Sequence, residues 1–440
     1  MGYEATAWSS SGVALSSNGQ VAGRRWKILP AGARADAARL LSARSLRAFA
    51  DGFVSVLLPV YLIRLGFSEL QVGAITAATL AGSAALTLGV GLVAHRFPQK
   101  RLLVRATALM ALTGVGFAFV HQFWPLMAIA FIGTLNPSSG DVSVILPLEQ
   151  ALLPQTVPER ERTALFARYA FVASLAGAVG ALCAAVPGLI SKHHSGTELH
   201  AIQAMFLVYG ALGAMAGLLY RGLSPAVELS SGGPRSSSAL GESKRRIYGL
   251  AALFSLDAFG GGLIVQSMLA LWLFHRFHLS VETAGTIFFW TGILSGLSFL
   301  AAPWVASRIG LIRTMVFTHL PSNILLLLVP FMPNLGLALA TLFARSALSQ
   351  MDVPTRTSYV MAVVTPAERP AAASVTAVPR SLAASVSPVL SGYLLGLSTF
   401  GWPLVLAGTI KAIYDILVLV SFGDIRPPEE AGDDRRRSTV

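Results

Sequence analysis

Residues 223–246 read LSPAVELSSGGPRSSSALGESKRR and form the longest polar interruption between the apolar segments of the chain. Serine, glycine and proline are frequent in this stretch, which ends in Lys244, Arg245 and Arg246. A segment of this composition has few apolar side chains to bury, so it is typical of a flexible linker. It divides the remaining sequence into two halves, each dominated by apolar residues.

Each half contains six apolar segments, and each segment is close to the ~20 residues that a helix needs to cross about 30 Å of hydrocarbon. We therefore expect an all-α membrane protein with twelve transmembrane helices at 46–66, 70–94, 101–121, 124–146, 164–188, 201–220, 247–273, 282–306, 311–331, 334–355, 372–396 and 402–422. The expected organisation is a flexible cytoplasmic N-terminal tail at 1–45, a six-helix bundle at 46–222, a cytoplasmic linker at 223–246, a second six-helix bundle at 247–423 and a cytoplasmic tail at 424–440.

The composition of the 440 residues agrees with this interpretation. Hydrophobic residues make up 54% of the chain and charged residues only 12%, and the mean hydropathy is +0.65. A soluble domain carries about 25–35% charged residues on its surface, so a chain of soluble domains is excluded. The single cysteine excludes a disulfide scaffold and a cysteine-rich metal site, and we expect no metal.

The distribution of basic residues predicts the orientation. With the N-terminus inside, the inner loops and their flanks hold 25 of the 33 lysines and arginines, and the outer ones hold three. This asymmetry follows the positive-inside rule, so both termini are expected in the cytoplasm. The net charge of +12 is spread between apolar segments, which argues against nucleic acid as a partner. No eukaryotic targeting signal is recognisable, and we expect a bacterial inner membrane.

The two halves resemble each other in sequence. Arg96 and Arg308 are 212 residues apart, as are Gly73 and Gly285. Asp141 and Asp352 are separated by nearly the same interval, 211 residues. A near-constant offset between basic loops and helix positions indicates a duplicated six-helix unit.

With these features the chain resembles the major facilitator superfamily over residues 46–423. The loop signature of that family survives in two degenerate copies, formed by Gly91, Arg96, Lys100, Arg101, Arg308, Gly310 and Arg313. His95 and Ser307 stand at the acidic positions of the signature. The resemblance implies two pseudo-symmetric six-helix bundles around a central cavity, which a monomeric secondary transporter exposes to each side of the bilayer in turn.

Five aspartates fall inside the expected helices, although an acid at bilayer depth costs ~2.5–3.5 kcal/mol. They are Asp51, Asp141, Asp257, Asp352 and Asp415. The first four lie on the first, fourth, seventh and tenth helices, which line the cavity according to the resemblance. Asp257 lies ~15 Å into its helix, near mid-membrane, whereas Asp51 lies only ~8 Å in. We expect Asp257 either to carry a proton or to be permanently paired with an arginine.

Arg345 also lies near mid-membrane, ~17 Å into its helix. Arginine cannot be neutralised, so it needs an anion, which is either Asp257 or a carboxylate or phosphate of the substrate. On the last helix, Lys411 and Asp415 are four residues apart, and we expect them to neutralise each other.

Asp141 and Asp352 are expected near the cytoplasmic mouth, at heights comparable with Arg168, Arg380 and Arg356. Ion pairs among these residues are predicted to act as a gate or as interhelical struts. Substrate contact is the alternative.

Two helix-breaking stretches bear on function. Residues 136–140, NPSSG, predict either a kink in the fourth helix or an unwound segment whose carbonyls reach a ligand. Residues 387–392, SPVLSG, are similar to a motif of drug antiporters in the same superfamily, with serines substituted for glycines. This similarity favours export.

We therefore predict a proton-coupled exporter of a small organic solute. Uptake, facilitated transport without an ion, and a non-transporting sensor on the same fold remain alternatives. The sequence contains no H-E-x-x-H, G-x-S-x-G or Walker A pattern, so we expect no catalytic residues, no enzyme activity and no cofactor. The expected partners are the lipid bilayer, a small-molecule substrate and protons.

Overall fold

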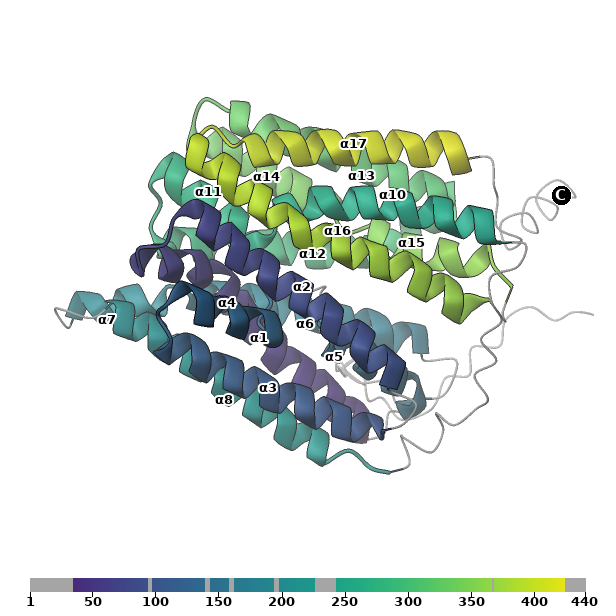
Figure 1. Cartoon of the computed structure of the whole chain (residues 1–440). Coiled ribbons are helices and arrows are strands. Elements are labelled where there is room, and N and C mark those ends of the chain that lie inside the picture. The colour runs from purple at the N-terminus through teal and green to yellow at the C-terminus, as the bar shows by residue number, and fades with distance from the viewer. Residues whose placement is uncertain are drawn as a thin grey trace, which may run out of the picture.

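The computed structural model describes residues 35–93, 97–138, 143–157, 162–193, 198–225, 243–365 and 368–423, and these are almost entirely helical, with no strand among them. The helices lie side by side along one direction (Figure 1). The first half contains α1 (Ala35–Arg64), α2 (Glu69–Val93), α3 (Gln99–Phe119), α4 (Phe123–Ile132), α5 (Ile145–Leu152), η1 (Leu153–Thr156), α6 (Arg162–Cys183), α7 (Val186–His193) and α8 (Glu198–Arg221).

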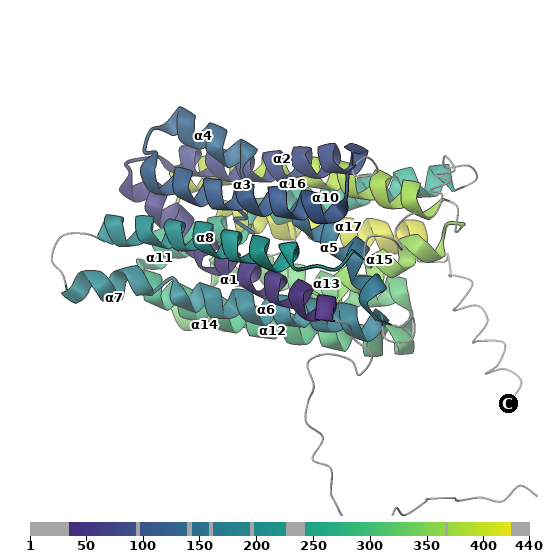
Figure 2. The same cartoon turned by 90° about the horizontal axis from the view of Figure 1, so that it is seen from below.

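The second half repeats this arrangement and occupies the other side of the molecule (Figure 1). Seen from below, the first half lies in front of it (Figure 2). It contains α10 (Lys244–Leu263), α11 (Gln266–Phe277), α12 (Val281–Ile309), α13 (Leu311–Leu328), η3 (Val329–Phe331), α14 (Leu335–Leu348), α15 (Asp352–Ala362), α16 (Arg369–Leu397) and α17 (Trp402–Phe422). The predicted fold of two six-helix bundles is confirmed. Residues 226–242 of the expected linker lie outside the described residues.

Nine helical segments in the described part of the chain are long and apolar enough to cross a membrane. They correspond to nine of the twelve expected spans. Two of the others, 124–146 and 334–355, are each broken in the middle, into α4 and α5 and into α14 and α15. The single helices expected there were wrong, because a non-helical stretch containing Pro137 and the turn at 349–351 interrupt them. The last, α16, is continuous over 29 residues but contains Pro379 and Pro388.

The first helix begins well before its expected start. α1 runs from Ala35, so only residues 1–34 of the expected tail lie outside the described residues. Basic residues near the N-terminal side of this helix are accommodated inside the protein, since Arg47 is buried and ion-paired with Glu149 of α5. Asp51 is therefore ~24 Å from the start of its helix rather than ~8 Å.

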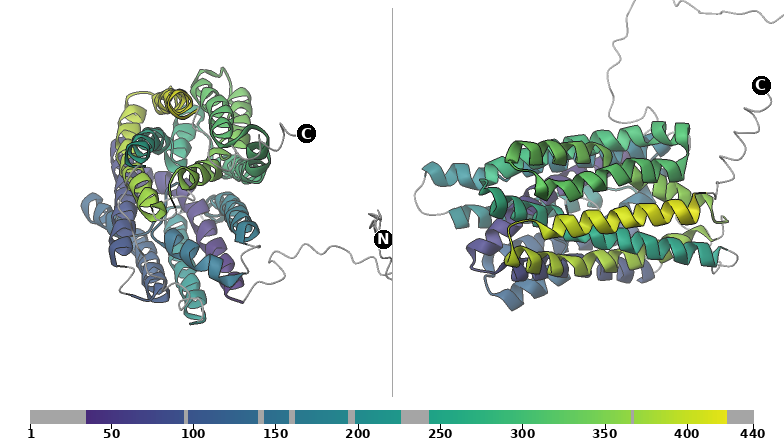
Figure 3. Two further views of the ribbon diagram at one scale, coloured as in Figure 1. Left: turned by 90° about the vertical axis from the view of Figure 1, so that its right-hand side faces the viewer. Right: turned by 90° about the horizontal axis from the view of Figure 1, so that it is seen from above.

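The apolar core has three parts. One cluster contains residues of both halves, including Tyr61 of α1 and Trp272 of α11, near the end of the molecule where α1 turns into α2. The two other clusters lie toward the opposite end, where α17 finishes, and each belongs to one half only, around Tyr220 and around Tyr414. We call the end where α1 turns into α2 the turn end, and the end where α17 finishes the terminal end. The halves share a common core at the turn end and have separate cores at the terminal end. The end-on view shows the two groups of helices (Figure 3).

Two helix pairs form the seams between the halves, α2 with α16 and α6 with α12. Glycines permit close backbone approach in both. A Cβ at Gly73 would lie 2.4 Å from the Pro388 oxygen, and a Cβ at Gly285 would lie 2.6 Å from the Ala181 oxygen. These two glycines are the pair that repeats at an interval of 212 residues, so the duplication in the sequence is also a duplication of the seam.

Candidate functional site

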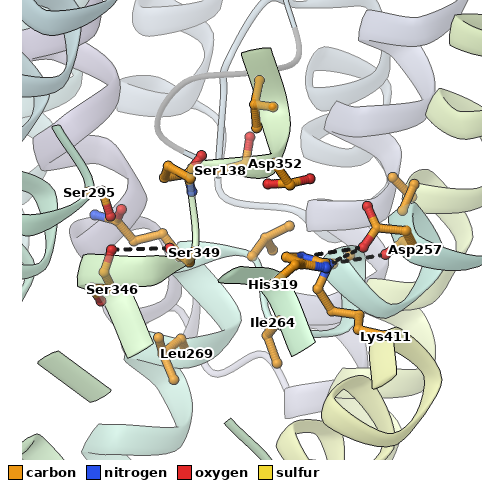
Figure 4. A pocket seen from close by; sticks show the side chains of 18 of the residues that line it. Ser138, Asp257, Ile264, Leu269, Ser295, His319, Ser346, Ser349, Asp352 and Lys411 are labelled. Carbon is orange, nitrogen blue, oxygen red and sulfur yellow. Dashed lines mark hydrogen bonds and ion pairs between the residues drawn. The ribbon is translucent and has the colours of Figure 1, made fainter. Parts of the chain in front are cut away.

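A cavity of about 310 Å³ lies in the middle of the bundle, at the low end of the range for ligand pockets. Almost all of its lining comes from the second half, from α10 to α17 (Figure 4). From the first half it receives Leu80 of α2 and Ser138, which follows the end of α4. Ser138 reaches the cavity because the chain is not helical there.

The broken helices meet beside this cavity. α10 ends at Leu263 and α11 begins at Gln266, and residues between them line the cavity. The backbone N–H of Ser267 donates to the carbonyl oxygen of Pro137 at 3.2 Å. The predicted unwinding at 136–140 therefore places a carbonyl against the opposite half. Residues 139–142, and with them Asp141, lie outside the described residues.

Asp257, on α10, is buried in the cavity wall and has three basic neighbours. Lys411 Nζ of α17 donates to its Oδ1 at 2.5 Å. Arg356 Nη1 of α15 donates to its Oδ2 at 3.0 Å. His319 Nε2 of α13 lies 3.8 Å from Oδ1. Asp257 therefore connects four helices, and its arginine partner is Arg356 rather than Arg345.

Asp415 is also buried, and its partners are on α13. His319 Nδ1 lies 2.8 Å from Asp415 Oδ1, and Asn323 Nδ2 donates to Oδ2 at 2.8 Å. The expected local pair of Lys411 and Asp415 does not form, because Lys411 turns to Asp257 instead. The i, i+4 spacing still places both residues on one face of α17, but that face contacts two different helices, α10 and α13.

Asp352 and Arg356, both predicted as gate residues, belong to the same network. Asp352 Oδ2 lies 3.5 Å from Arg356 Nη1, and both side chains are buried at the cavity. The break before α15 brings its first turn to the level of Asp257. We name the six residues Asp257, His319, Asp352, Arg356, Lys411 and Asp415 the charge cluster.

Arg345, near the end of α14, lines the cavity but has no carboxylate partner among the described residues. Its Nε is buried and makes no hydrogen bond. The two other predicted gate arginines are in different places, since Arg380 of α16 lines the cavity and Arg168 lies on α6.

The first half has its own buried network, away from the cavity. Arg47 donates to Glu149, and Tyr169 and Tyr220 each donate to the same carboxylate at 2.5 Å. Asp51 lies near Arg47 and is not among the described residues that line the cavity. Asp51 was expected to line the cavity, but it is buried within the first half instead.

The loop motif lies at the terminal end. In the first copy, Gly91 belongs to α2, Arg96 is outside the described residues, Arg101 is exposed, and Lys100 Nζ donates to the Leu223 oxygen at 2.8 Å. In the second copy, Arg308 stacks on the Trp304 ring at 5.4 Å and Arg313 is exposed. Gly310 joins α12 to α13 with φ of +86°, a conformation that favours glycine.

The sequence interpretation missed His319, Asn323 and Glu149. A signal existed for the first two, because His319 and Asn323 are four residues apart in an otherwise apolar run. That spacing places two polar side chains on one helix face. Glu149 lay just beyond the expected fourth helix, and only the fold brings it to Arg47.

Comparison with curated proteins gives one relative of similar length. The uncharacterized membrane protein YJR124C of Saccharomyces cerevisiae is 23% identical over 410 residues, which cover 86% of this chain and 92% of that protein.

Solved structures share the fold at low identity. A mutant of the nucleoside transporter NupG has a TM-score of 0.70 at 14% identity and covers 88% of this chain and 100% of its own. A bacterial homolog to the human lysosomal transporter Spinster, inward-facing and unoccupied, has a TM-score of 0.67 at 13% identity, with 87% and 95% covered. The human organic anion transporter MFSD10 has a TM-score of 0.58 at 15% identity, with 89% and 100% covered.

A family model described as the Major Facilitator Superfamily matches residues 40–344 and, in a second match, residues 249–439. The matches overlap and together cover most of the chain. They agree with the duplicated bundles, the two glycine seams and the cavity in the middle of the bundle. The chain therefore belongs to the Major Facilitator Superfamily.

Proposed function

We propose that this chain exports a small organic solute in exchange for protons, by exposing the central cavity to each side of the membrane in turn. Its family makes it a secondary transporter of a small solute in a lipid bilayer. Membership of the family does not determine proton coupling or the direction of transport. The observation that carries the coupling is the charge cluster in the cavity wall.

The cluster contains an unequal number of charges. Asp257, Asp352 and Asp415 supply three carboxylates, whereas Arg356 and Lys411 supply two cations. With a neutral His319 the cluster therefore has one excess negative charge. A buried excess charge is costly, so the cluster has a physical reason to bind one proton.

The geometry supports His319 as the residue that binds this proton. Nδ1 faces Asp415 Oδ1 at 2.8 Å and also lies 3.0 Å from Asn323 Nδ2. We assign the hydrogen of the neutral ring to Nδ1, because an ionised carboxylate only accepts hydrogen bonds and Asn323 Nδ2 already donates to the other oxygen of Asp415. Nε2 of the neutral ring then has a lone pair, and it faces the carboxylate of Asp257 at 3.8 Å. Protonation at Nε2 turns this contact into an attraction. It also makes His319 compete with Lys411 and Arg356 for Asp257.

This competition supplies a link between protonation and helix position. The residues of the cluster are on α10, α13, α15 and α17, and several of these helices also line the cavity. When Asp257 exchanges one cationic partner for another, the relative free energy of two packing arrangements changes. A proton and a solute that favour different arrangements are then coupled.

Different features of the chain indicate its orientation in the membrane and its direction of transport. The basic residues concentrate at the terminal end, so we place that end and both termini in the cytoplasm. The two halves share a core at the opposite end, which suits a cavity that faces the cytoplasm and takes up solute there. The similarity of residues 387–392 to an antiporter motif supports export.

The test is untargeted mass spectrometry of cells and medium. Cells with the wild-type chain, with Asp257→Asn, with Glu198→Gln and with empty vector are compared with and without a protonophore. Glu198 pairs with Arg64 at 2.8 Å at the surface and serves as the matched acid outside the cavity. We expect one compound to become enriched in the medium with the wild type and Glu198→Gln only while the proton gradient is intact.

Each other outcome has a defined meaning. Accumulation inside the cells under the same conditions would reverse the direction to uptake. Enrichment that survives both the protonophore and Asp257→Asn would indicate a facilitator and remove the charge cluster from the mechanism. No protein-dependent change in any compound would contradict transport and favour a sensor.

A further inference from the structure

We infer that Arg345 is the anion-binding residue of the cavity and that the transported solute carries a carboxylate or phosphate group. This inference rests on the proposed transport function and names the substrate class for the same cavity. It depends on the contrast between Arg345, a partly buried residue whose Nε is buried, and two buried arginines, and on the groups that surround Arg345.

Two buried arginines elsewhere in the bundle are ion-paired with carboxylates. Arg47 is paired with Glu149, and Arg356 with Asp257 and Asp352. Arg345 has no such partner among the described residues, and this separates it from Arg47, because a buried Nε without a hydrogen bond is common to both. The acids of the charge cluster are occupied by Lys411, Arg356 and His319.

A guanidinium group at this depth cannot reduce its cost by losing a proton. A buried cation without an anion is unfavourable, and intramembrane charges generally face a polar pathway or a partner. Arg345 lines the cavity, so an anion that enters the cavity can reach it. The planar group binds carboxylate or phosphate through two parallel hydrogen bonds, which also orients the solute.

The neighbours of Arg345 indicate what else the solute carries. The hydroxyl of Ser346 donates to the Leu342 oxygen at 2.8 Å, and that of Ser349 donates to the Ser346 oxygen at 3.3 Å. Their protons are committed to the helix, so their oxygens act toward the cavity as acceptors. In Figure 4, these serines and Ser295 lie apart from Asp257 and Lys411. The site therefore suits a small organic anion with a hydroxyl or amino group near its acid.

The substrate class also agrees with export. A proton that moves inward and an anion that moves outward both carry positive charge toward the cytoplasm. The membrane potential, which is negative inside, therefore drives both movements.

The experiment measures thermal unfolding of the purified full chain in detergent. The probes are lactate, malate, citrate and inorganic phosphate, each compared with sodium chloride at matched ionic strength. The proteins are the wild type, Arg345→Gln, Arg345→Lys and Arg276→Gln. Arg276 is an exposed arginine at the end of α11 and controls for loss of one positive charge.

We expect at least one probe to raise the unfolding temperature of the wild type and Arg276→Gln in a saturable manner. Arg345→Gln should bind that probe about tenfold more weakly or worse, and Arg345→Lys should retain part of the affinity. Without a probe, Arg345→Gln should unfold at the same or a higher temperature than the wild type.

An equal response of the wild type and Arg345→Gln, or no anion-specific response at all, would overturn the inference. So would a marked loss of stability in Arg345→Gln without a probe, because it would reveal a structural partner. The binding test needs no proton gradient, so it can succeed while proton coupling fails. Conversely, export of an uncharged solute by proton exchange would overturn only this inference.

Discussion

Asp257 and Lys411 are separated by 154 residues in the sequence, yet Oδ1 of the one and Nζ of the other are 2.5 Å apart. Lys411 makes this contact although Asp415 lies one turn away on its own helix. Asp415 instead binds His319 and Asn323 of α13. One face of α17 therefore joins α10 and α13, and the two contacts share His319 as a common neighbour.

The first prediction concerns the pair Asp257 and Lys411. Asp257→Asn should destabilise the protein by about 3–5 kcal/mol, because it leaves Lys411 buried without its carboxylate. Lys411→Met should cost less, because Asp257 keeps Arg356 as a partner. The double variant should be destabilised by clearly less than the sum. Thermal unfolding in detergent of the wild type, the two single variants and the double variant measures this double-mutant cycle. Additive effects would show that the two residues do not interact.

The second prediction concerns His319. In His319→Gln, the amide can still donate to Asp415, but the side chain no longer binds a proton. We expect exchange of solute across vesicles without a gradient to persist, whereas a pH gradient should no longer drive accumulation. His121→Gln is the matched control, since His121 is an exposed residue that contacts Gln203 at 2.7 Å. Accumulation in His319→Gln at the wild-type level would exclude His319 as the proton site.

The third prediction compares Arg47, which is buried, with Arg345, which is partly buried. Arg47→Gln should cost about 3–5 kcal/mol of stability, since it leaves Glu149 buried without its cation. Arg345→Gln should cost nothing or stabilise the protein, since it removes a cation that has no carboxylate partner in the described chain. Unfolding temperatures of the two variants in the same detergent give the comparison. A similar loss in both would contradict the distinction.

The fourth prediction concerns the seam between α2 and α16. Gly73→Val places methyl groups where a Cβ already lies 2.4 Å from the Pro388 oxygen. The helices must separate, which should cost about 1–3 kcal/mol and strongly reduce transport. Gly89→Val on the same helix meets nothing within 4 Å and should behave as the wild type. Normal transport by Gly73→Val would show that close approach at this seam is dispensable.

The fold followed from local features of the sequence. The length of the apolar segments locates most of the membrane spans. The repeat at 212 residues identifies Gly73 and Gly285 as equivalent positions in the two halves. The depth of Asp257 in its helix also follows from counting residues, because a continuous helix has a fixed rise. These properties depend on near neighbours in the chain, and they required no knowledge of tertiary contacts.

The pairings of the charged residues did not follow in the same way. The i, i+4 rule identified the shared face of Lys411 and Asp415 but not the helices that this face contacts. Arg356 seemed to belong to the cytoplasmic mouth, because the break before Asp352 was not apparent. His319 reaches Asp415 across 96 residues. Such contacts depend on how twelve helices pack, which hydrophobic periodicity does not determine.

The most direct test of proton coupling is the stoichiometry of exchange in proteoliposomes that contain the purified chain. Internal pH is followed with a trapped fluorescent dye while the exported solute, once identified in the medium, is counted by mass spectrometry. We expect about one proton moved per solute by the wild type and by Glu198→Gln, because the cluster has one unbalanced charge. Solute movement by the wild type without any proton movement would contradict it.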